Sequence, residues 1–393
     1  MNWQLSRLPQ VLFGEGVSAQ LTNLIQSYGT RVLLITGAQS FDAQPQSQSL
    51  LTAWQQAGFR LWHERVSTEP SPQWVDACVA QHAENAIQVV VAIGGGSALD
   101  AAKAVAGLLP VQRSVMDYLE GVGLELPYTA EALPFIAMPT TAGTGTEATK
   151  NAVLSQTGEG GFKKSFRHDS LMPRWAVIDP SWMLSLPRQQ IAFNGLDAIT
   201  QLIEGYTSSK ANLFTDGLAL AGLERGFAAL PRWFDHPQDL QAANDMAYAA
   251  LMSGIVLAHA GLGAVHGLTA PLGAFFPAPH GAVCGILLAE CTAMNIEQLQ
   301  AQQPESESLA RYATIGRLLM QDPTISDASA LVLLVEKLRQ WHQAFALPSL
   351  SHFGLNQHEI PRVVANARGN SMKTNPVLLS DVQLTEILNA CCH

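Results

Sequence analysis

Residues 87–103 read IQVVVAIGGGSALDAAK, and this segment indicates the fold class more clearly than any other. An apolar, β-rich run over 87–93 ends at three glycines and leads into a segment with helical spacing. Glycines let the backbone approach a pyrophosphate, and the start of a helix offers N–H donors and positive potential. The spacing is not GxGxxG, so the common Rossmann fingerprint is absent. A phosphate site and a tight strand-to-helix turn capped by Ser97 both stay open for this stretch alone.

Two more apolar runs have the same form. Residues 31–36 (RVLLIT) end at Gly37, and residues 135–138 (FIAM) end at Pro139. Residues 47–58, between the first two runs, have helical spacing. Continuous apolar strands that alternate with helices predict a parallel sheet covered on both faces, with ligands at the carboxyl ends of the strands.

The character of the sequence changes after residues 176–180, which read AVIDP. Strand signals become rare, and alanine- and leucine-rich stretches with a period near 3.6 residues follow at 215–230, 240–257 and 329–345. We therefore expect an α/β domain with a parallel sheet over residues 1–181 and an all-α domain over residues 182–393. A length of 393 residues suits two domains of about 100–200 residues each.

Composition narrows the class of partner. A formal net charge of −10 disfavours nucleic acid and anionic membranes as partners. The five cysteines form no CxxC pair, which argues against a disulfide framework, and we expect Cys391 and Cys392 to lie in a frayed tail. Residues 246–289 lack Asp, Glu, Lys and Arg, but glycines and prolines interrupt them, so they predict a buried core rather than a membrane span. The N-terminal segment shows no signal pattern, and we expect a reduced, soluble, cytoplasmic protein.

A second glycine-rich loop follows the run at 135–138. Residues 138–147 read MPTTAGTGTE, and their four threonines form a polar loop that can line a nicotinamide and its ribose. Seen alone, it is equally a threonine- and glycine-rich loop with no ligand. Two such loops after parallel strands point to one crevice, which favours a dinucleotide.

The second half supplies candidate metal ligands. Asp197 and Gln201 are four residues apart, so they share one face of a helix. His266 lies in GAVHG (263–267) and His280 lies in PHG (279–281). An oxygen ligand and two imidazoles suit zinc or ferrous iron. A hydrogen-bonded core histidine is the alternative at each position, because Asp197 and the histidines are far apart in sequence.

As a set and in this order, these motifs resemble the iron-containing (group III) alcohol dehydrogenase family. The likeness begins at PQVLFGEG (9–16) and also covers GLDAITQLIEGYTSSKANLFTD (195–216) and GAVHGLTAPLG (263–273). It implies a dinucleotide-binding N-terminal domain, a metal-binding helical domain and an active site between them. The implied activity is NAD(P)-linked interconversion of a small alcohol and its aldehyde with divalent iron or zinc, and the implied assembly is a homodimer or larger homo-oligomer.

The resemblance also assigns residues to roles. It places Asp197, His266 and His280 where metal ligands belong, with Gln201 at the edge of the site. It assigns the dinucleotide to Gly95, Gly96, Ser97 and Asp100 on the pyrophosphate side, to Thr140, Thr141 and Thr144 along the phosphates and ribose, and to Lys163, with Lys164 as the alternative register.

Two departures from the family pattern concern the metal and the cofactor. Gln201 stands where a histidine ligand is usual, and an amide oxygen is a weaker donor than imidazole for zinc or iron. Gly37 stands where members that prefer NAD commonly carry an aspartate. Losing that carboxylate removes a repulsion against a 2′-phosphate, so the sequence leans toward NADP.

A third departure concerns the proton path. Ala270 stands where many members carry a histidine near the substrate. A water, the ribose hydroxyl or a different residue must then relay the proton. His259, seven residues before His266, is a candidate if it faces the cleft, and a core or surface histidine is the alternative. We also expect Leu268, Phe275 and Phe276 to make the cleft moderately apolar.

Two alternatives stay open. A lyase of the dehydroquinate-synthase type shares the two-domain plan, but it needs clustered lysines and arginines, and residues 254–291 contain none. A cofactor-binding relative with weakened catalysis would explain Gln201 and Ala270.

Overall fold

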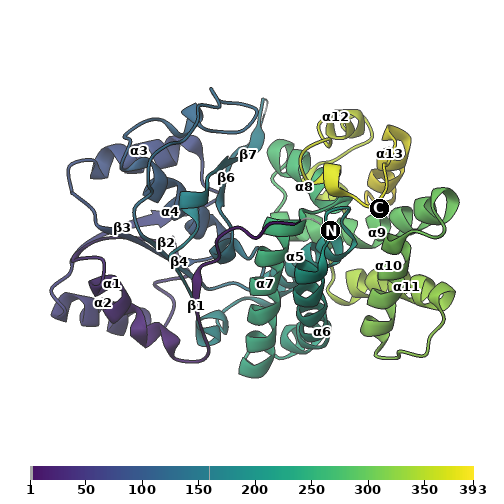
Figure 1. Ribbon diagram of the computed structural model, residues 1–393, viewed down its shortest axis with the longest axis horizontal. Helices are drawn as coiled ribbons and strands as arrows, with labels where there is room; N and C mark the ends of the chain where they lie inside the picture. Colours follow the sequence, from purple (N-terminus) through teal and green to yellow (C-terminus); the bar gives the residue numbers. More distant parts are fainter. Residues whose placement is uncertain (1–2, 159) are drawn as a thin grey trace.

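The computed structural model describes residues 3–158 and 160–393. Six strands in its first half form a parallel sheet with the order β1-β8-β5-β4-β2-β3. The half with the sheet and the helical half lie side by side (Figure 1). The strands are Gln10–Phe13 (β1), Arg31–Gly37 (β2), Arg60–Val66 (β3), Val89–Gly94 (β4), Phe135–Pro139 (β5) and Trp175–Ile178 (β8). The predicted parallel sheet is confirmed, and β4 with its glycines lies in its interior, between β5 and β2.

Helices cover both faces of this sheet because its strands are apolar on both sides. Along β4, Val90 and Ala92 join one buried cluster, whereas Val89 and Val91 join another. The helices that supply side chains to these clusters are α1 (Leu21–Gln26) and α2 (Ser47–Gln56) on one face, and α3 (Pro72–His82) and α4 (Gly96–Leu108) on the other. Successive residues of a strand point to opposite faces, so each strand helps to build two cores.

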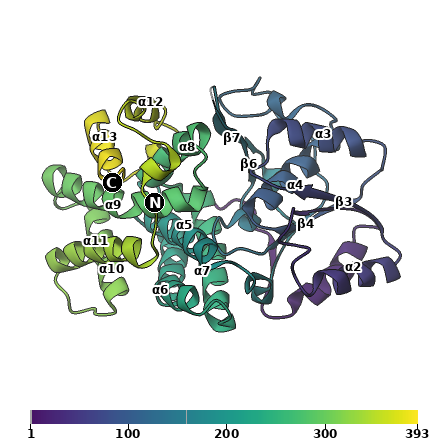
Figure 2. The same ribbon diagram turned by 180° about the vertical axis from the view of Figure 1, so that it is seen from behind.

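An antiparallel pair of strands, β6 (Asn151–Gln156) and β7 (Phe162–Arg167), stands apart from the main sheet. It follows the loop at 138–147 and lies toward the helical half, where β7 contacts α8 (Ala264–Phe275) (Figure 2). The sequence analysis does not predict this pair.

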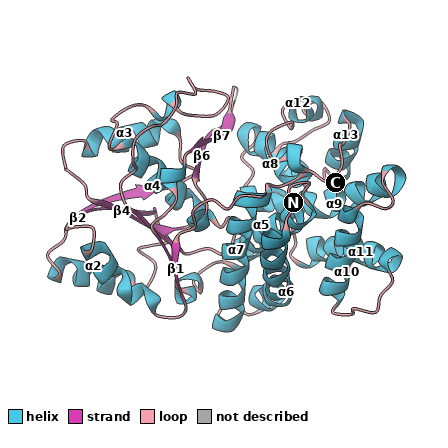
Figure 3. Ribbon diagram, viewed as in Figure 1, coloured by secondary structure: helices cyan, strands magenta, loops and turns pink. Residues whose placement is uncertain are grey.

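The second half consists of helices joined by loops, with no strand in its described length (Figure 3). Its other helices are α5 (Arg188–Thr207), α6 (Leu213–Asp235), α7 (Leu240–Ala260), α9 (His280–Gln302), α10 (Glu307–Met320), α11 (Asp327–Ala344), α12 (Ile360–Ala365) and α13 (Asp381–Ala390). The three predicted helical stretches fall within α6, α7 and, except for Phe345, α11. The division at residues 181 and 182 falls within the 3-10 helix Pro180–Met183 and stays a prediction.

The run without charged residues is mostly buried. Among the described helices, α9 has the length and apolarity of a membrane span, as does the pair α7 and α8, which is bent by 99°. However, 72% of the apolar window in α9 is buried inside the protein.

The expectation of a frayed C-terminal tail is wrong. Cys391 and Cys392 are buried, and the Leu350 N–H donates to the Cys391 carbonyl.

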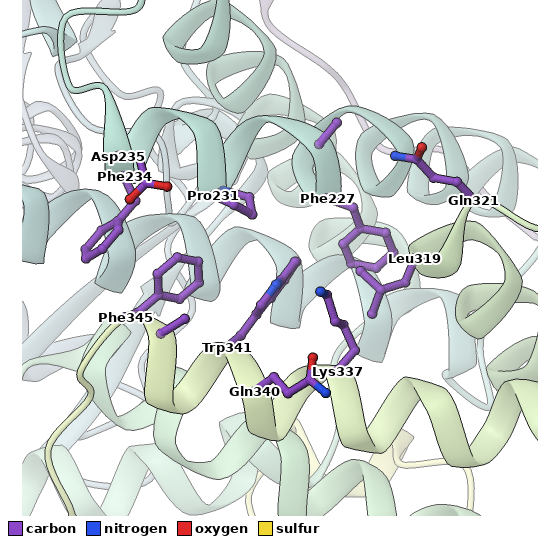
Figure 4. Close-up of a pocket in the computed structure, with 12 residues that line it drawn as sticks. Phe227, Pro231, Phe234, Asp235, Leu319, Gln321, Lys337, Gln340, Trp341 and Phe345 are labelled. Atoms are coloured by element: carbon purple, nitrogen blue, oxygen red, sulfur yellow. The ribbon is translucent and has the colours of Figure 1, made fainter.

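A pocket on the helical half lies between α6 and α11 (Figure 4). Aromatic side chains dominate it, with Phe227 and Phe234 on α6 facing Trp341 and Phe345 at the end of α11. None of the described residues that line it is a histidine or a cysteine.

Candidate metal and cofactor site

A larger cavity of about 820 Å³ lies between the two halves of the chain. The sheet half contributes Gly96, Asp100 and Lys163 to its lining, and the helical half contributes Asp197 and His280. Both glycine-rich loops follow the carboxyl ends of their strands, β4 and β5, which is where ligands of parallel sheets bind.

Three of the predicted metal ligands converge at this cavity. The Oδ1 atom of Asp197 lies 3.2 Å from Nε2 of His266 and 3.7 Å from Nε2 of His280. Together with Cys284, they offer four ligand atoms that all lie within 4.8 Å of one another. Helix α5 supplies Asp197, α8 supplies His266 near its start, and α9 begins at His280.

Glu204 fixes the orientation of the His266 ring. Its Oε2 lies 2.6 Å from Nδ1 of His266, and its Oε1 accepts from the backbone N–H of Val265 at 2.7 Å. Glu204 lies seven residues after Asp197 on α5, so both side chains share one helix face. A carboxylate on one ring nitrogen holds the other ring nitrogen toward a metal and strengthens it as a ligand.

The electrostatics keep the Asp197 carboxylate charged. Burial alone would raise the pKa of Asp197, but His280, His266 and the amide of Gln201 lower it to about 2. Burial and the charge of Lys163 lower the pKa of His280 to about 4. Burial alone would lower the pKa of His266, but Cys284, Glu204 and Asp197 raise it well above its usual value. At neutral pH the Asp197 carboxylate is therefore charged and His280 is neutral, and a metal that binds Nε2 of His266 would displace the proton that its raised pKa retains.

The spacing of these donors fits a metal ion. Ligands about 2.0–2.2 Å from a tetrahedral ion lie about 3.3–3.6 Å from one another. The measured separations of 3.2 and 3.7 Å bracket that range. Gln201 lines the same cavity and directs its amide nitrogen toward this set, and its role at the metal stays a prediction. Its Nε2 donates to Asp197 Oδ1 at 3.1 Å, and its buried Oε1 has no hydrogen-bond partner among the described residues.

The first glycine-rich loop forms a cradle at the start of α4. Gly95 is the N-cap, and no side chain in the described chain caps this helix end, so its N–H groups are free for an anion. A Cβ atom on Gly96 would lie 2.9 Å from Oγ1 of Thr144, so only glycine lets the two loops come this close. This arrangement fits the pyrophosphate of a dinucleotide.

The predicted cofactor residues fall into two groups. Gly96, Ser97, Asp100, Thr144 and Lys163 line the cavity. The others are not among the described residues that line it, although they lie close by: Gly95 beside Thr141, Thr140 bonded to the Gly94 carbonyl, and Gly37 next to Gly94.

Both candidate lysines reach the cavity. Lys163 pairs with Glu69 and has a side chain that is 10% exposed. Lys164 lines the same cavity and is exposed. The choice between these two registers for the cofactor lysine therefore stays open.

The structure does not bring His259 to the cavity. Its Nδ1–H donates to the Ile255 carbonyl at 2.7 Å, and its Nε2 accepts from the Ser6 N–H at 3.1 Å. A spacing of seven residues puts His259 and His266 on the same face only within one continuous helix. Helix α7 instead ends before Gly261, and α8 is bent from it by 99°. Both ring nitrogens are thus bonded elsewhere, and His259 is not among the described residues that line the cavity.

The apolar lining also differs from the prediction. Leu268, Phe275 and Phe276 are not among the described lining residues, and Leu268 is fully buried in the core. Phe193, Leu257 and Leu262 line the cavity instead, and so does Ala270.

Sequence reasoning missed three residues of this region. Lys103 is fully buried and donates to the carbonyls of Thr146 and Asn151. Glu204 and Cys284 complete the surroundings of His266. The sequence itself contains two helical spacings, since Cys284 is four residues after His280 and Glu204 is seven residues after Asp197. Neither spacing indicates a partner until the helices are placed.

Two family models together match nearly the whole chain. Residues 9–180 match the model described as iron-containing alcohol dehydrogenase. Residues 191–392 match the model described as Fe-containing alcohol dehydrogenase family, C-terminal.

Individual relatives agree with these matches. The probable alcohol dehydrogenase EutG of Escherichia coli (strain K12) is 34% identical over 314 residues, which cover 79% of this chain and 75% of that protein. Alcohol dehydrogenase 4 of Saccharomyces cerevisiae (strain YJM789) is 29% identical over 383 residues, 97% of this chain and 96% of that protein. A crystal structure of a 1,3-propanediol oxidoreductase shares the fold, with a TM-score of 0.90, 24% identity and full coverage of both chains.

Proposed function

This chain belongs to the iron-containing alcohol dehydrogenase family and is an oxidoreductase that acts on CH–OH groups, and we propose that it interconverts a small alcohol and its aldehyde in the cavity between its two halves. One observation carries the proposal: Asp197, His266 and His280 converge on a cavity that the glycine-rich cofactor loops also line. We propose these three residues as metal ligands. A cytoplasmic location and a homodimer or larger assembly stay predictions.

The residues of this chain divide the work of the reaction. A divalent metal held by Asp197, His266 and His280 would supply Lewis acidity to the substrate oxygen, beside a nicotinamide that gives or takes hydride. Glu204 holds His266 in the ligating orientation. The start of α4 binds the pyrophosphate, and Thr144 packs against it. Phe193, Leu257 and Leu262 reduce water access near the reacting carbon.

The direct test is a screen with metals and cofactors. The purified chain, loaded separately with Zn²⁺ and Fe²⁺, is given NADH or NADPH and a panel of small aldehydes. Metal-dependent consumption of reduced cofactor supports the proposal. Metal and cofactor binding without turnover would indicate a weakened relative, and turnover of a phosphorylated carboxylic acid without net cofactor consumption would indicate the lyase.

We expect NADPH to be used at least as well as NADH, and Gly37→Asp to lower the NADPH/NADH ratio of kcat/KM by about tenfold or more. A carboxylate at the end of β2 would repel the 2′-phosphate, and a tenfold effect needs only about 1.4 kcal/mol. Gly37→Asn is the matched control, since it adds the same bulk beside Ser40 without the charge. An unchanged ratio in Gly37→Asp, or an equal drop in Gly37→Asn, would refute this explanation.

We expect the wild-type pH–rate profile to lack a limb near the unperturbed histidine pKa of roughly 6.5. His266 and His280 are the histidines among the described lining residues, and both are proposed ligands. Ala270 is exposed and lines the cavity, so Ala270→His places a general acid there, a role typically worth about 10²–10⁴-fold. The variant should gain a limb near neutrality in kcat against pH.

The control for this experiment is His259→Ala. Because the ring of His259 is bonded to Ser6 and Ile255, its loss should leave the wild-type profile unchanged. A wild-type limb near neutrality that disappears in His259→Ala would show that this histidine relays the proton after all.

A further inference from the structure

Gln201 brings an amide and no imidazole to the metal cluster. The Gln201 amide nitrogen faces Asp197, and the oxygen of the same amide is buried without a partner among the described residues. An N–H group cannot ligate a cation. Asp197, His266 and His280 then give three protein donors, the number usual for a catalytic zinc, whereas structural zinc sites have four.

A thiol occupies the remaining side of the cluster. Cys284 lies on α9 one turn after His280, so both side chains leave the same helix face. Its Sγ is 3.7 Å from Nε2 of His266 and 3.8 Å from Nε2 of His280. Around a tetrahedral zinc with bonds of about 2.3 Å to sulfur and 2.0–2.1 Å to nitrogen, this separation is about 3.6 Å. The thiol is therefore where a fourth ligand belongs.

The burial of this thiol is compatible with an open catalytic face. Cys284 is fully buried and is not among the described residues that line the cavity, whereas Asp197, His266 and His280 all line it. A ligand from behind leaves the face toward the cavity free for a substrate oxygen, and zinc accepts a fifth ligand during reaction. The Thr269 hydroxyl also lies near Sγ, at 3.8 Å.

We propose that Cys284 is the fourth metal ligand of this site, replacing the donor that Gln201 does not supply, and that the resulting set favours zinc over iron. This inference rests on the proposed function, since it concerns the same metal. On binding, the S–H bond breaks, the proton goes to solvent and the sulfur electron pair forms the bond to the metal. Thiolate is a soft donor and zinc takes it readily, which is the basis of the selectivity.

The first measurement uses Co²⁺ as a spectroscopic probe in the full-length protein. A thiolate on Co²⁺ gives an intense sulfur-to-metal charge-transfer band in the near ultraviolet, which oxygen and nitrogen ligands do not give. Wild type should show this band at one Co²⁺ per chain. Cys284→Ser and Cys284→Ala should lose it. Cys291→Ser is the matched control, because Cys291 is equally buried on α9, seven residues further along, and the variant should keep the band.

The second measurement is metal affinity and selectivity. Loss of groups around metal ligands already costs about 10–100-fold in affinity, so Cys284→Ser should weaken Zn²⁺ binding by about 100-fold or more. It should also lower the zinc-to-iron ratio retained from an equimolar mixture. Gln201→Ala should leave the cobalt band in place.

The outcomes separate this inference from the proposed function. A wild type that binds one Co²⁺ without the band, or a Cys284→Ser protein that keeps it, overturns the thiolate ligand while the site stands. Equal Zn²⁺ affinity in wild type and Cys284→Ser overturns it as well. If wild type binds no Co²⁺, or Asp197→Ala binds it as tightly as wild type, the proposed metal site itself is wrong.

Discussion

An Asp197→Ala variant is expected to lose its metal and at least about 10³-fold in kcat/KM for aldehyde reduction. Asp197 is the proposed anionic ligand, and its Oδ1 lies at the centre of the contacts with His266 and His280. Without it, the two imidazoles and the Cys284 sulfur must hold a dication with no carboxylate. Lewis acidity is worth several kcal/mol of transition-state stabilisation, and about 4 kcal/mol corresponds to 10³-fold. Metal content by elemental analysis and steady-state kinetics measure the two effects.

The control must separate ligand loss from damage to α5. Thr200→Val changes a buried side chain on the same helix, whose hydroxyl bonds only to the Leu196 carbonyl among the described residues. It should keep the metal and nearly all activity. Circular dichroism checks that the Asp197→Ala protein is folded. If the folded variant keeps the metal content and the kcat/KM of wild type, Asp197 is not a ligand.

Lys103→Met is expected to lower the free energy of unfolding by about 3 kcal/mol and to raise KM for the dinucleotide. The Lys103 ammonium donates to the Thr146 carbonyl at 2.9 Å, the Thr149 hydroxyl at 3.0 Å and the Asn151 carbonyl at 2.9 Å. These bonds tie α4 to the second cofactor loop. Removing one partner from a buried charged contact typically costs about 3–5 kcal/mol, and the apolar methionine offsets part of this.

Lys150→Met offers a matched control in the same segment. Lys150 pairs with Asp169 at 2.6 Å, but the Asp169 side chain is 74% exposed, so the pair contributes at most about 1 kcal/mol. Urea unfolding of both variants gives the comparison. Similar small losses in the two proteins would show that the buried ammonium does not hold the loop.

The sequence was most informative where burial was complete. Strands β2, β4 and β5 were predicted because both faces of each are buried, which leaves a continuous apolar run. By contrast, β3 reads RLWHERV at the edge of the sheet, and β7 reads FKKSFR beside the cavity. Their exposed faces carry charged residues, so neither had the apolar signal of a central strand.

The same contrast holds for the candidate site. Asp197, His266 and His280 were proposed from motifs and resemblance, and the structure brings them together. Cys284 and Glu204 had no such signal, because their roles depend on how α5, α8 and α9 meet. Residue spacing within one helix is set by its period, but contacts between helices are set by packing of the whole core.

Anomalous diffraction at the zinc and iron absorption edges of crystals of the full-length, catalytically competent protein would locate the metal relative to Asp197, His266 and His280. We expect one strong anomalous-difference peak about 2.0–2.3 Å from the carboxylate of Asp197 and from Nε2 of His266 and His280. In crystals grown from protein offered both metals, the peak should be larger at the zinc edge. The opposite result would be protein that contains one metal per chain, with its only peak elsewhere and none between these three residues. That result would show that Asp197, His266 and His280 do not form the metal site.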